Sequence, residues 1–168
     1  MIDTDAVARE VVEPPSPVLE SIRAEFGSGV IAADGRLDRE ALGRIVFADV
    51  NKRRRLNEIT HPEILKRVLA RIGRYPPSAL VVVVVPLLFE SGFERNCQKV
   101  LAVVAPEQQR LARIISRDGL TEAEARARVR AQLAESEYEH RGDFVLRNVG
   151  DMASLERDVE AVWSALSQ

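Results

Sequence analysis

The sequence predicts an α/β fold with a parallel sheet, because buried strands alternate with helices along the chain. Leu80–Val85 sets five consecutive valines behind a leucine, a pattern typical of a strand buried on both faces. Lys99–Val104 predicts a second buried strand, and Asp143–Leu146 alternates like a short third strand. Ile2, close to the start of the chain, fits the end of a fourth strand.

Four helices are expected before the first long strand. Asp5–Val12 predicts a short helix, and Pro17 opens a second helix with one apolar face. Asp38 is a suitable cap for the third helix. Lys52–Ile72 predicts the fourth, and because Pro62 interrupts it, a kink or a division into two segments is expected there.

Three further helices are expected after the second strand. Pro106–Arg117 predicts a helix with proline at its first position, where proline is tolerated. Thr121 and Glu124 have the spacing of a capping box, and the helix that they open is expected to continue to about His140. The last helix is expected over about Ser154–Ser167.

Length and composition indicate a globular protein of one domain. The chain has 168 residues, of which 46% are hydrophobic and 30% are charged. A net charge of -2 argues against general binding to nucleic acid or to a membrane surface. The single cysteine, Cys97, can form no internal disulfide and cannot by itself hold a structural zinc ion, which fits a reducing compartment.

The start of the chain and its apolar runs predict neither export nor membrane insertion. Met1 is followed by Ile-Asp-Thr-Asp, without the basic start and apolar run of a signal peptide. The longest apolar run, Ala79–Phe89, is interrupted by Pro86 and is far shorter than the ~20 residues of a membrane span. We therefore expect a cytoplasmic protein with no nucleic-acid or membrane partner, and the sequence leaves its oligomeric state open.

Two places in the sequence set carboxylates at the ends of predicted strands. The segment Val85–Gly92 leaves the valine-rich strand with apolar side chains and Glu90, and ligands of open α/β sheets bind at such ends. The alternative is an ordinary strand exit whose leucines pack into the core. Asp3 and Asp5 follow Ile2, so that one of them could serve as a general base or orient a magnesium ion. The alternative is that Asp5 caps the following helix.

Basic side chains suggest a second set of candidates. His61 could contact a phosphate or a carbonyl, or could be a partner in helix packing. Arg113 and Arg117 are four residues apart on one predicted helix, where two cations repel unless an anion neutralises them. Phosphate suits guanidinium groups, and Glu107 is the alternative partner. The next predicted helix adds Arg128 among side chains of both charges. The two helices together could form a lid over a polyphosphate, or their charged side chains could simply face solvent.

Taken together, these residues resemble the dephospho-coenzyme A kinase family. The resemblance extends over nearly the whole chain in the same order, and its Pro-Leu-Leu-Phe-Glu and His-Pro elements are specific in combination. The matching residues are Ile2–Asp5, Ala8, Arg9, Val11, Val12, Phe26, Gly27, Asp34–Arg39, Leu42, Leu56, Asn57, His61, Pro62, Val85–Glu90, Arg113, Arg117–Gly119, Arg128, Gln132 and Asn148.

The resemblance implies a P-loop kinase-like fold of three layers with a parallel sheet. It implies a single kinase domain over residues 1–168, with a helical coenzyme A-binding region at about 14–75 and a helical lid at about 107–141. The implied reaction moves the γ-phosphoryl group of ATP, with Mg²⁺ as the companion of ATP, to the ribose 3′-hydroxyl of dephospho-coenzyme A. This reaction is the last step of coenzyme A synthesis.

The resemblance also assigns roles to individual residues. It implies that Asp5 is the catalytic carboxylate that accepts the hydroxyl proton and that Arg113 is the catalytic contact to phosphate. The implied substrate-binding residues are Asp3, Arg9, His61, Leu87, Phe89 and Glu90. The implied ATP-binding residues are Arg113, Arg117, Arg128 and Asn148. No resident metal ligand is implied.

The chain departs from the family pattern at its start. Family members have about thirty residues more there, which form the first strand, the Gly-rich loop with its Lys and Ser/Thr, and the first helix. The sequence contains no such loop, so we expect a truncated gene model that begins at an internal Met, with negligible kinase activity and poor solubility. The alternatives are a catalytically degenerate relative that binds coenzyme A-like ligands and another small-molecule P-loop kinase.

Overall fold

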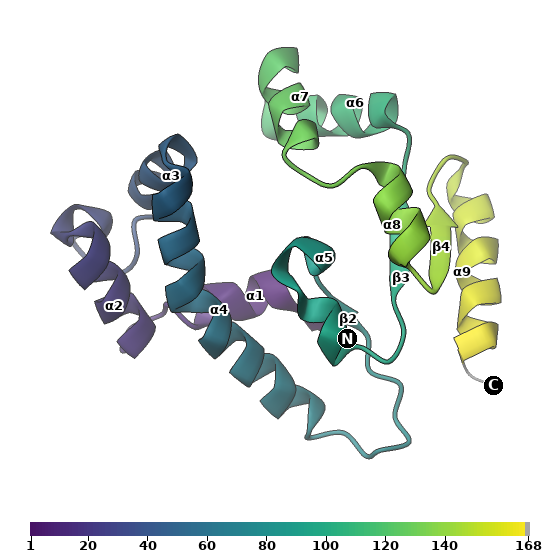
Figure 1. Ribbon diagram of the computed structural model, residues 1–168, viewed down its shortest axis with the longest axis horizontal. Coiled ribbons are helices and arrows are strands. Elements are labelled where there is room, and N and C mark those ends of the chain that lie inside the picture. Colours follow the sequence, from purple (N-terminus) through teal and green to yellow (C-terminus); the bar gives the residue numbers. More distant parts are fainter. Residues whose placement is uncertain (167–168) are drawn as a thin grey trace. The chain divides into compact units, whose positions relative to one another are not determined.

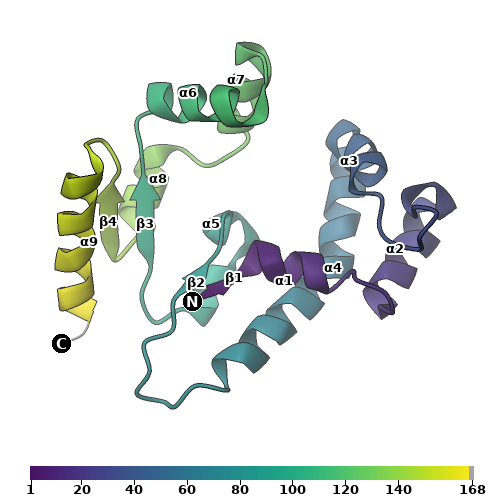
Figure 2. The same cartoon turned by 180° about the vertical axis from the view of Figure 1, so that it is seen from behind.

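The structure, a computed structural model, describes residues 1–166 and divides the chain into two compact units. The first unit is Met1–Pro86, and the second begins at Leu87. Figure 1 and Figure 2 show the helices and strands of both units from opposite sides.

The first unit combines one short parallel strand pair with four α-helices. Strand β1 pairs with β2 in parallel, with Ile2 opposite Val83 and Asp3 opposite Val84. The elements are β1 (Ile2–Asp3), α1 (Thr4–Glu10), α2 (Pro17–Phe26), the 3₁₀ helix η1 (Ser28–Val30), α3 (Arg39–Ala48), α4 (Val50–Ile72) and β2 (Val83–Val84). The fully buried side chains Val7, Val11, Ile22, Val30 and Val68 form the centre of this unit.

The helices of the first unit begin at side chains that satisfy the free N–H groups of a helix start. Ser16 Oγ accepts from the N–H groups of Val18 and Leu19 at 3.1 and 3.2 Å, in front of the expected Pro17. The expected cap Asp38 is confirmed, because its Oδ1 accepts from the first turn of α3 at 3.1 and 2.9 Å. Asp49 caps α4 in the same way, which was not foreseen.

Helix α4 runs through Pro62 without interruption, so the expected division into two segments does not occur. Proline removes one hydrogen bond of the helix and crowds the preceding turn. Helix α4 packs against α1, α2 and α3, and tertiary packing of this kind stabilises a helix beyond its own hydrogen bonds.

The valine-rich segment forms a shorter and more exposed strand than its sequence predicts. Strand β2 has two residues, and Val82 and Val84 remain 44% and 43% exposed. The expectation of burial on both faces over Leu80–Val85 is therefore wrong for the described chain. The reason is geometric: β2 has β1 as its one strand neighbour among the described residues, and alternate side chains of this segment point to a face that those residues leave open.

The second unit contains the longer parallel pair. Strand β3 pairs with β4 in parallel, from Leu101 opposite Phe144 to Val104 opposite Arg147, so the predicted parallel pairing is confirmed. The elements are α5 (Leu88–Ser91), the 3₁₀ helix η2 (Phe93–Asn96), β3 (Leu101–Val104), α6 (Glu107–Asp118), α7 (Glu122–Arg130), α8 (Glu135–Arg141), β4 (Phe144–Arg147) and α9 (Met152–Leu166). Ala102 is buried while Val103 is 62% exposed, so β3 is buried on one face and not on both as expected.

Two helical expectations in the second unit need correction. Pro106 is the residue before α6 and not its first helical residue. The capping box of Thr121 and Glu124 is present, with both reciprocal hydrogen bonds, but the helix that it opens ends at Arg130. A separate helix, α8, begins at Glu135, and residues 131–134 link the two. Residue 167, at the end of the last predicted helix, lies outside the described residues.

Candidate active site

Two carboxylates, those of Asp3 and Asp5, lie at the carboxyl end of β1, and they differ in their hydrogen bonds. Asp3 Oδ1 accepts a hydrogen bond from the backbone N–H of Asp5 at 2.8 Å and is the N-cap of α1. Thr4 Oγ1 donates to the carbonyl of Val84 at 3.0 Å, which fastens the first residue of α1 to the end of β2. The alternative in which Asp5 caps the helix is therefore wrong, because Asp3 has that role.

The side chain of Asp5 is exposed, and within residues 1–166 its carboxylate accepts no hydrogen bond and forms no ion pair. It lies in the first turn of α1, directly after the strand end. Ligands of open α/β sheets bind at this end of the strands. A carboxylate that is fixed by its backbone and free at its oxygens can accept a proton from a bound hydroxyl.

Arg9 and His61 lie on two helices of the first unit that pack together, α1 and α4. Partial burial lowers the pKa of the His61 imidazole, which favours its neutral form. A neutral imidazole suits a hydrogen bond to a ligand better than charge pairing with a phosphate. The bonds between the helices come from other residues: Glu10 accepts from Arg71 through its carboxylate and from Arg67 through its carbonyl.

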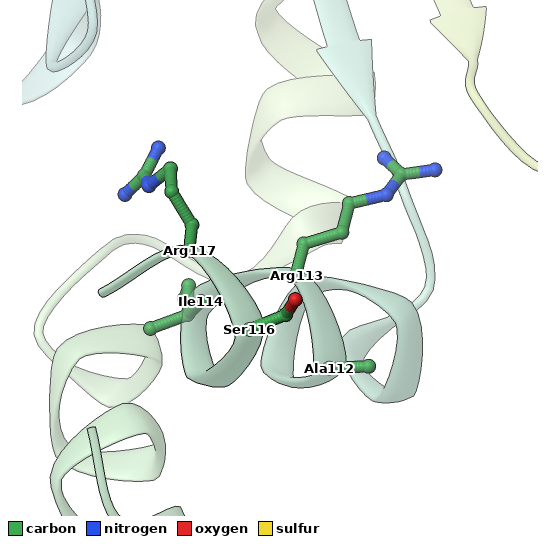
Figure 3. A pocket seen from close by; sticks show the side chains of 5 residues that line it. All are labelled: Ala112, Arg113, Ile114, Ser116 and Arg117. Carbon is green, nitrogen blue, oxygen red and sulfur yellow. The ribbon is translucent and has the colours of Figure 1, made fainter. Parts of the chain in front are cut away.

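In the second unit, one face of α6 presents two guanidinium groups. Figure 3 shows Arg113 and Arg117 extending from the same side of the helix, with the hydroxyl of Ser116 beside the base of Arg113. A surface hollow of about 570 Å³ is lined by Ala112, Arg113, Ile114, Ser116 and Arg117. The predicted shared face of Arg113 and Arg117 is thus present.

Arg117 and Arg128 share one carboxylate. Asp118 accepts from Arg117 Nε at 2.7 Å and from Arg128 Nη1 at 2.7 Å. The hydrogen bond from Arg117, with Arg128 beside it, lowers the pKa of Asp118. Glu107, the alternative partner that the sequence suggested, instead lies 3.5 Å from Arg126. The side chains of Arg117, Asp118 and Arg128 therefore form a compact group with one net positive charge.

Of the two cations on this face of α6, Arg113 is the less compensated. Its Nη2 lies 3.4 Å from Gln109 Oε1 and 3.5 Å from Asn148 Oδ1, and in the described part of the chain no carboxylate lies within ion-pair distance. Asn148 follows β4, and its backbone N–H donates to the carbonyl of Val104 at 2.8 Å. Arg113 and Asn148 thus meet beside the carboxyl ends of β3 and β4, the edge at which open α/β sheets bind ligands.

The segment after Pro86 begins the second unit. Leu87 is 46% exposed, whereas Phe89 is 8% exposed and belongs to the core. Glu90 Oε1 accepts from the hydroxyl of Tyr138 at 2.6 Å and from the N–H of Leu133 at 3.3 Å. Sequence reasoning missed Tyr138, since no local pattern joins residues that are 48 positions apart.

The two units divide the predicted residues between them. Asp3, Asp5, Arg9 and His61 belong to the first unit, and Leu87, Phe89, Glu90, Arg113, Arg117, Arg128 and Asn148 belong to the second. Among residues 1–166, no three His, Cys, Asp or Glu side chains gather in a way that could hold a metal ion. No helix in the same range is both long enough and apolar enough to cross a membrane.

Comparison with known proteins gives one consistent result. Residues 1–154 match the family model described as dephospho-CoA kinase. A dephospho-CoA kinase of Moorella thermoacetica is 44% identical over 100% of this chain and 81% of its own length. One from Symbiobacterium thermophilum is 42% identical over 98% of this chain and 70% of its own length.

Solved structures agree in fold. A crystal structure from Thermus thermophilus superposes with a TM-score of 0.83 and 36% identity, over 99% of this chain and 84% of that one. A dephospho-CoA kinase from Campylobacter jejuni gives a TM-score of 0.72 and 28% identity, with the same two coverages of 99% and 84%. The expected α/β fold with parallel strand pairing is confirmed by both.

Proposed function

The chain belongs to the dephospho-coenzyme A kinase family, and we propose that it transfers the γ-phosphoryl group of ATP to the ribose 3′-hydroxyl of dephospho-coenzyme A. The products are coenzyme A and ADP. The observation that supports this proposal best in the structure is the free carboxylate of Asp5 at the carboxyl end of β1, beside an Asp3 that is occupied as a helix cap.

In the proposed reaction, the ribose 3′-oxygen forms a bond to the γ-phosphorus, and Asp5 accepts the proton that this hydroxyl loses. The bond between the γ-phosphorus and the bridging oxygen breaks, and that oxygen leaves with ADP. Such transfers depend on positioning and on stabilising charge at the phosphoryl oxygens. Asp5 suits the role of base because its oxygens are free and its backbone is held by Asp3 and, through Thr4, by β2.

Charge stabilisation is proposed to come from the α6–α7 region. Arg113 has amide neighbours and no carboxylate partner in the described residues, so its full positive charge is available to a phosphate. Arg117 and Arg128 add one net charge, because Asp118 neutralises half of theirs. Asn148 beside Arg113 offers an amide to the adenine side of the nucleotide.

The substrate side is proposed to include Asp3, Arg9, His61 and Leu87. Arg9 and Leu87 have exposed side chains, and His61 is a neutral hydrogen-bonding group. Phe89 supports this segment from the core. The proposed coenzyme A-binding region covers about 14–75, and the proposed lid covers about 107–141.

Mg²⁺ is proposed as a companion of ATP and not as a resident metal. The donors fit this: Asp3 and Asp5 are hard oxygen ligands at one strand end, and Mg²⁺ commonly needs one or two carboxylates besides water and phosphate oxygens. When bound, the ion neutralises charge on the β- and γ-phosphates.

A substrate panel tests the proposal. The protein purified from its source cells is incubated with ATP and either dephospho-coenzyme A or each nucleoside monophosphate, and the products are identified by mass spectrometry. Coenzyme A and ADP are expected from the first mixture alone. Phosphorylation of a nucleoside monophosphate instead would indicate another small-molecule kinase. Calorimetric binding of dephospho-coenzyme A without turnover would indicate a degenerate binding protein.

A further inference from the structure

Glu90 makes two hydrogen bonds to another part of the second unit through one of its carboxylate oxygens. Its Oε1 is the shared acceptor of two hydrogen bonds, from Tyr138 Oη at 2.6 Å and from the backbone N–H of Leu133 at 3.3 Å. Hydrogen bonds to an ionised carboxylate are stronger than those between neutral groups. Two hydrogen bonds at one oxygen hold the Glu90 side chain against residues 133 and 138.

Neighbouring residues reinforce this contact. The ring of Phe89 lies 5.8 Å from the ring of Tyr138, and the guanidinium carbon of Arg141 lies 4.2 Å above the same Phe89 ring. Arg141 also donates to Glu94 at 3.2 Å. We call this group of side chains the Glu90 clamp; it consists of Phe89, Glu90 and Glu94 on the α5–η2 side and of Leu133, Tyr138 and Arg141 on the α8 side.

The clamp acts at the point where the α6–α7 pair is connected to α8. Leu133 belongs to the link 131–134, between the end of α7 and the start of α8. Helices α6 and α7 pack on each other through Leu111, Ala125 and Val129. Figure 1 shows that the chain enters this pair from the end of β3 and leaves it through the link to α8. The link is therefore one of two attachment points of the helices that bear Arg113, Arg117 and Arg128.

The protonation of Tyr138 suits the donor role. Burial, followed by the hydrogen bond to Glu90, raises the pKa of Tyr138 to about 12. The phenol therefore keeps its proton near neutral pH and donates it to the carboxylate. A second bond holds the neighbouring link residue, since the side chain of Gln132 accepts from Arg110 of α6.

We propose that Glu90 is a positioning residue that, through Tyr138 and Leu133, fixes the α7–α8 link and so sets the orientation of the helix pair that bears the phosphate-binding arginines. The consequence for catalysis rests on the proposed function, whereas the consequence for the order of the link does not. Loss of the clamp is expected to loosen the link and to lower kcat, because the guanidinium groups are less often in place.

The test uses the protein from its source cells and two variants: Tyr138→Phe, which removes the donor hydroxyl, and Glu90→Gln, which keeps an acceptor oxygen but removes the charge that strengthens the bond. Tyr138→Phe deletes one hydroxyl and keeps the ring beside Phe89. The matched control is Ser164→Ala, which deletes one exposed hydroxyl and its 2.9 Å hydrogen bond to the carbonyl of Glu160 on α9, outside the proposed binding region and lid. Limited trypsin digestion of the native state, followed by mass spectrometry, reports cleavage after Arg130 next to the link.

Cleavage after Arg130 is expected to rise about fivefold in Tyr138→Phe, the factor that corresponds to one net hydrogen bond. A similar rise is expected in Glu90→Gln, because a hydrogen bond to a charged group is roughly twice as strong as one between neutral groups. The increase in the double variant is expected to be smaller than the product of the two single increases, because both variants act on the bond between Tyr138 and Glu90. In turnover assays, kcat is expected to fall by a similar factor while KM for dephospho-coenzyme A stays unchanged. The Ser164→Ala control is expected to match the parent protein in both assays.

Unchanged cleavage in both variants would overturn the proposal. A raised KM for dephospho-coenzyme A in Glu90→Gln, with unchanged cleavage and with normal kinetics in Tyr138→Phe, would show that Glu90 touches the substrate directly. If the parent protein proves to phosphorylate nothing, the proposed function fails, and the digestion result still decides whether the clamp orders the link.

Discussion

Asp3 holds the backbone N–H of Asp5 through a 2.8 Å hydrogen bond from that N–H to its side-chain oxygen. One aspartate is thereby used as a helix cap, and the other keeps its carboxylate free at the carboxyl end of β1. This difference in hydrogen bonding favours Asp5 as the proton acceptor and Asp3 as the residue that stabilises the start of α1. It also makes the two residues separable by mutation, although both are exposed acids at one strand end.

Asp5→Asn is expected to lower kcat by about 100-fold or more, since it removes the group that accepts the hydroxyl proton while keeping the size of the side chain. Binding of dephospho-coenzyme A, measured by calorimetry, and the melting temperature are expected to stay close to those of the parent protein. Retained turnover in Asp5→Asn would refute the proposed role.

Asp3→Ala is expected to lower the stability of the protein and to leave kcat close to that of the parent protein. Loss of a helix N-cap costs about 1 kcal/mol of unfolding free energy, so the variant should unfold at lower denaturant concentration. Urea unfolding followed by circular dichroism measures this change. If Asp3→Ala kept full stability and lost all activity, the roles of the two aspartates would have to be exchanged.

Arg113→Ala is expected to lower kcat/KM for ATP by about 100-fold or more, because Arg113 offers a charge that no carboxylate in the described chain offsets. Arg117→Ala is expected to lower kcat/KM for ATP by a smaller factor, because Arg117 shares Asp118 with Arg128 and its charge is already partly neutralised. Steady-state kinetics of both variants measure the difference.

Arg126→Ala is the matched control for the two arginine variants. Arg126 belongs to the same helix pair, but it is paired with Glu122 at 2.7 Å and with Glu107 at 3.5 Å. Its removal is expected to leave kcat/KM for ATP nearly unchanged. An equal loss in all three variants would mean that the general charge of the helix pair, and not the position of Arg113, supports binding.

The lowered pKa of Asp143 leads to a prediction of how the stability of the protein depends on pH. Hydrogen bonds from Lys99 at 2.9 Å and from the N–H of Val100 at 2.8 Å lower the pKa of Asp143 in the folded state. A lowered carboxyl pKa contributes stability above the unfolded-state value, and this contribution is lost as pH falls through the folded-state value. The melting temperature of the parent protein should therefore fall more steeply below about pH 4 than that of Asp143→Asn. Parallel melting curves would contradict this expectation.

Local sequence rules predicted those features that depend on neighbouring residues. Asp38, Pro17 and the pair Thr121–Glu124 open helices because their side chains or ring geometry act within one turn of the chain. The parallel pairing of β3 with β4 followed from apolar patterns that alternate with helices. The family resemblance supplied the candidate residues, and the catalytic roles of Asp5 and Arg113 stay predictions.

Features that depend on distant residues could not be read from local patterns. The break between α7 and α8 is stabilised by Glu90, which accepts the N–H of Leu133 from 43 positions away. The choice between Asp3 and Asp5 as helix cap depends on where α1 begins, which the strand pairing with β2 sets. The exposure of Val84 depends on what covers β2, and a run of valines specifies apolar character without specifying its partner.

The most direct test of the proposed reaction is phosphoryl transfer from γ-labelled ATP to dephospho-coenzyme A by the protein purified from its source cells, compared with its Asp5→Asn variant. We predict that the label appears on the ribose 3′-oxygen in coenzyme A with the parent protein, and that Asp5→Asn binds dephospho-coenzyme A but transfers the label at least about 100-fold more slowly. Transfer at equal rates by both proteins, or no transfer by the parent protein, would contradict the proposed reaction.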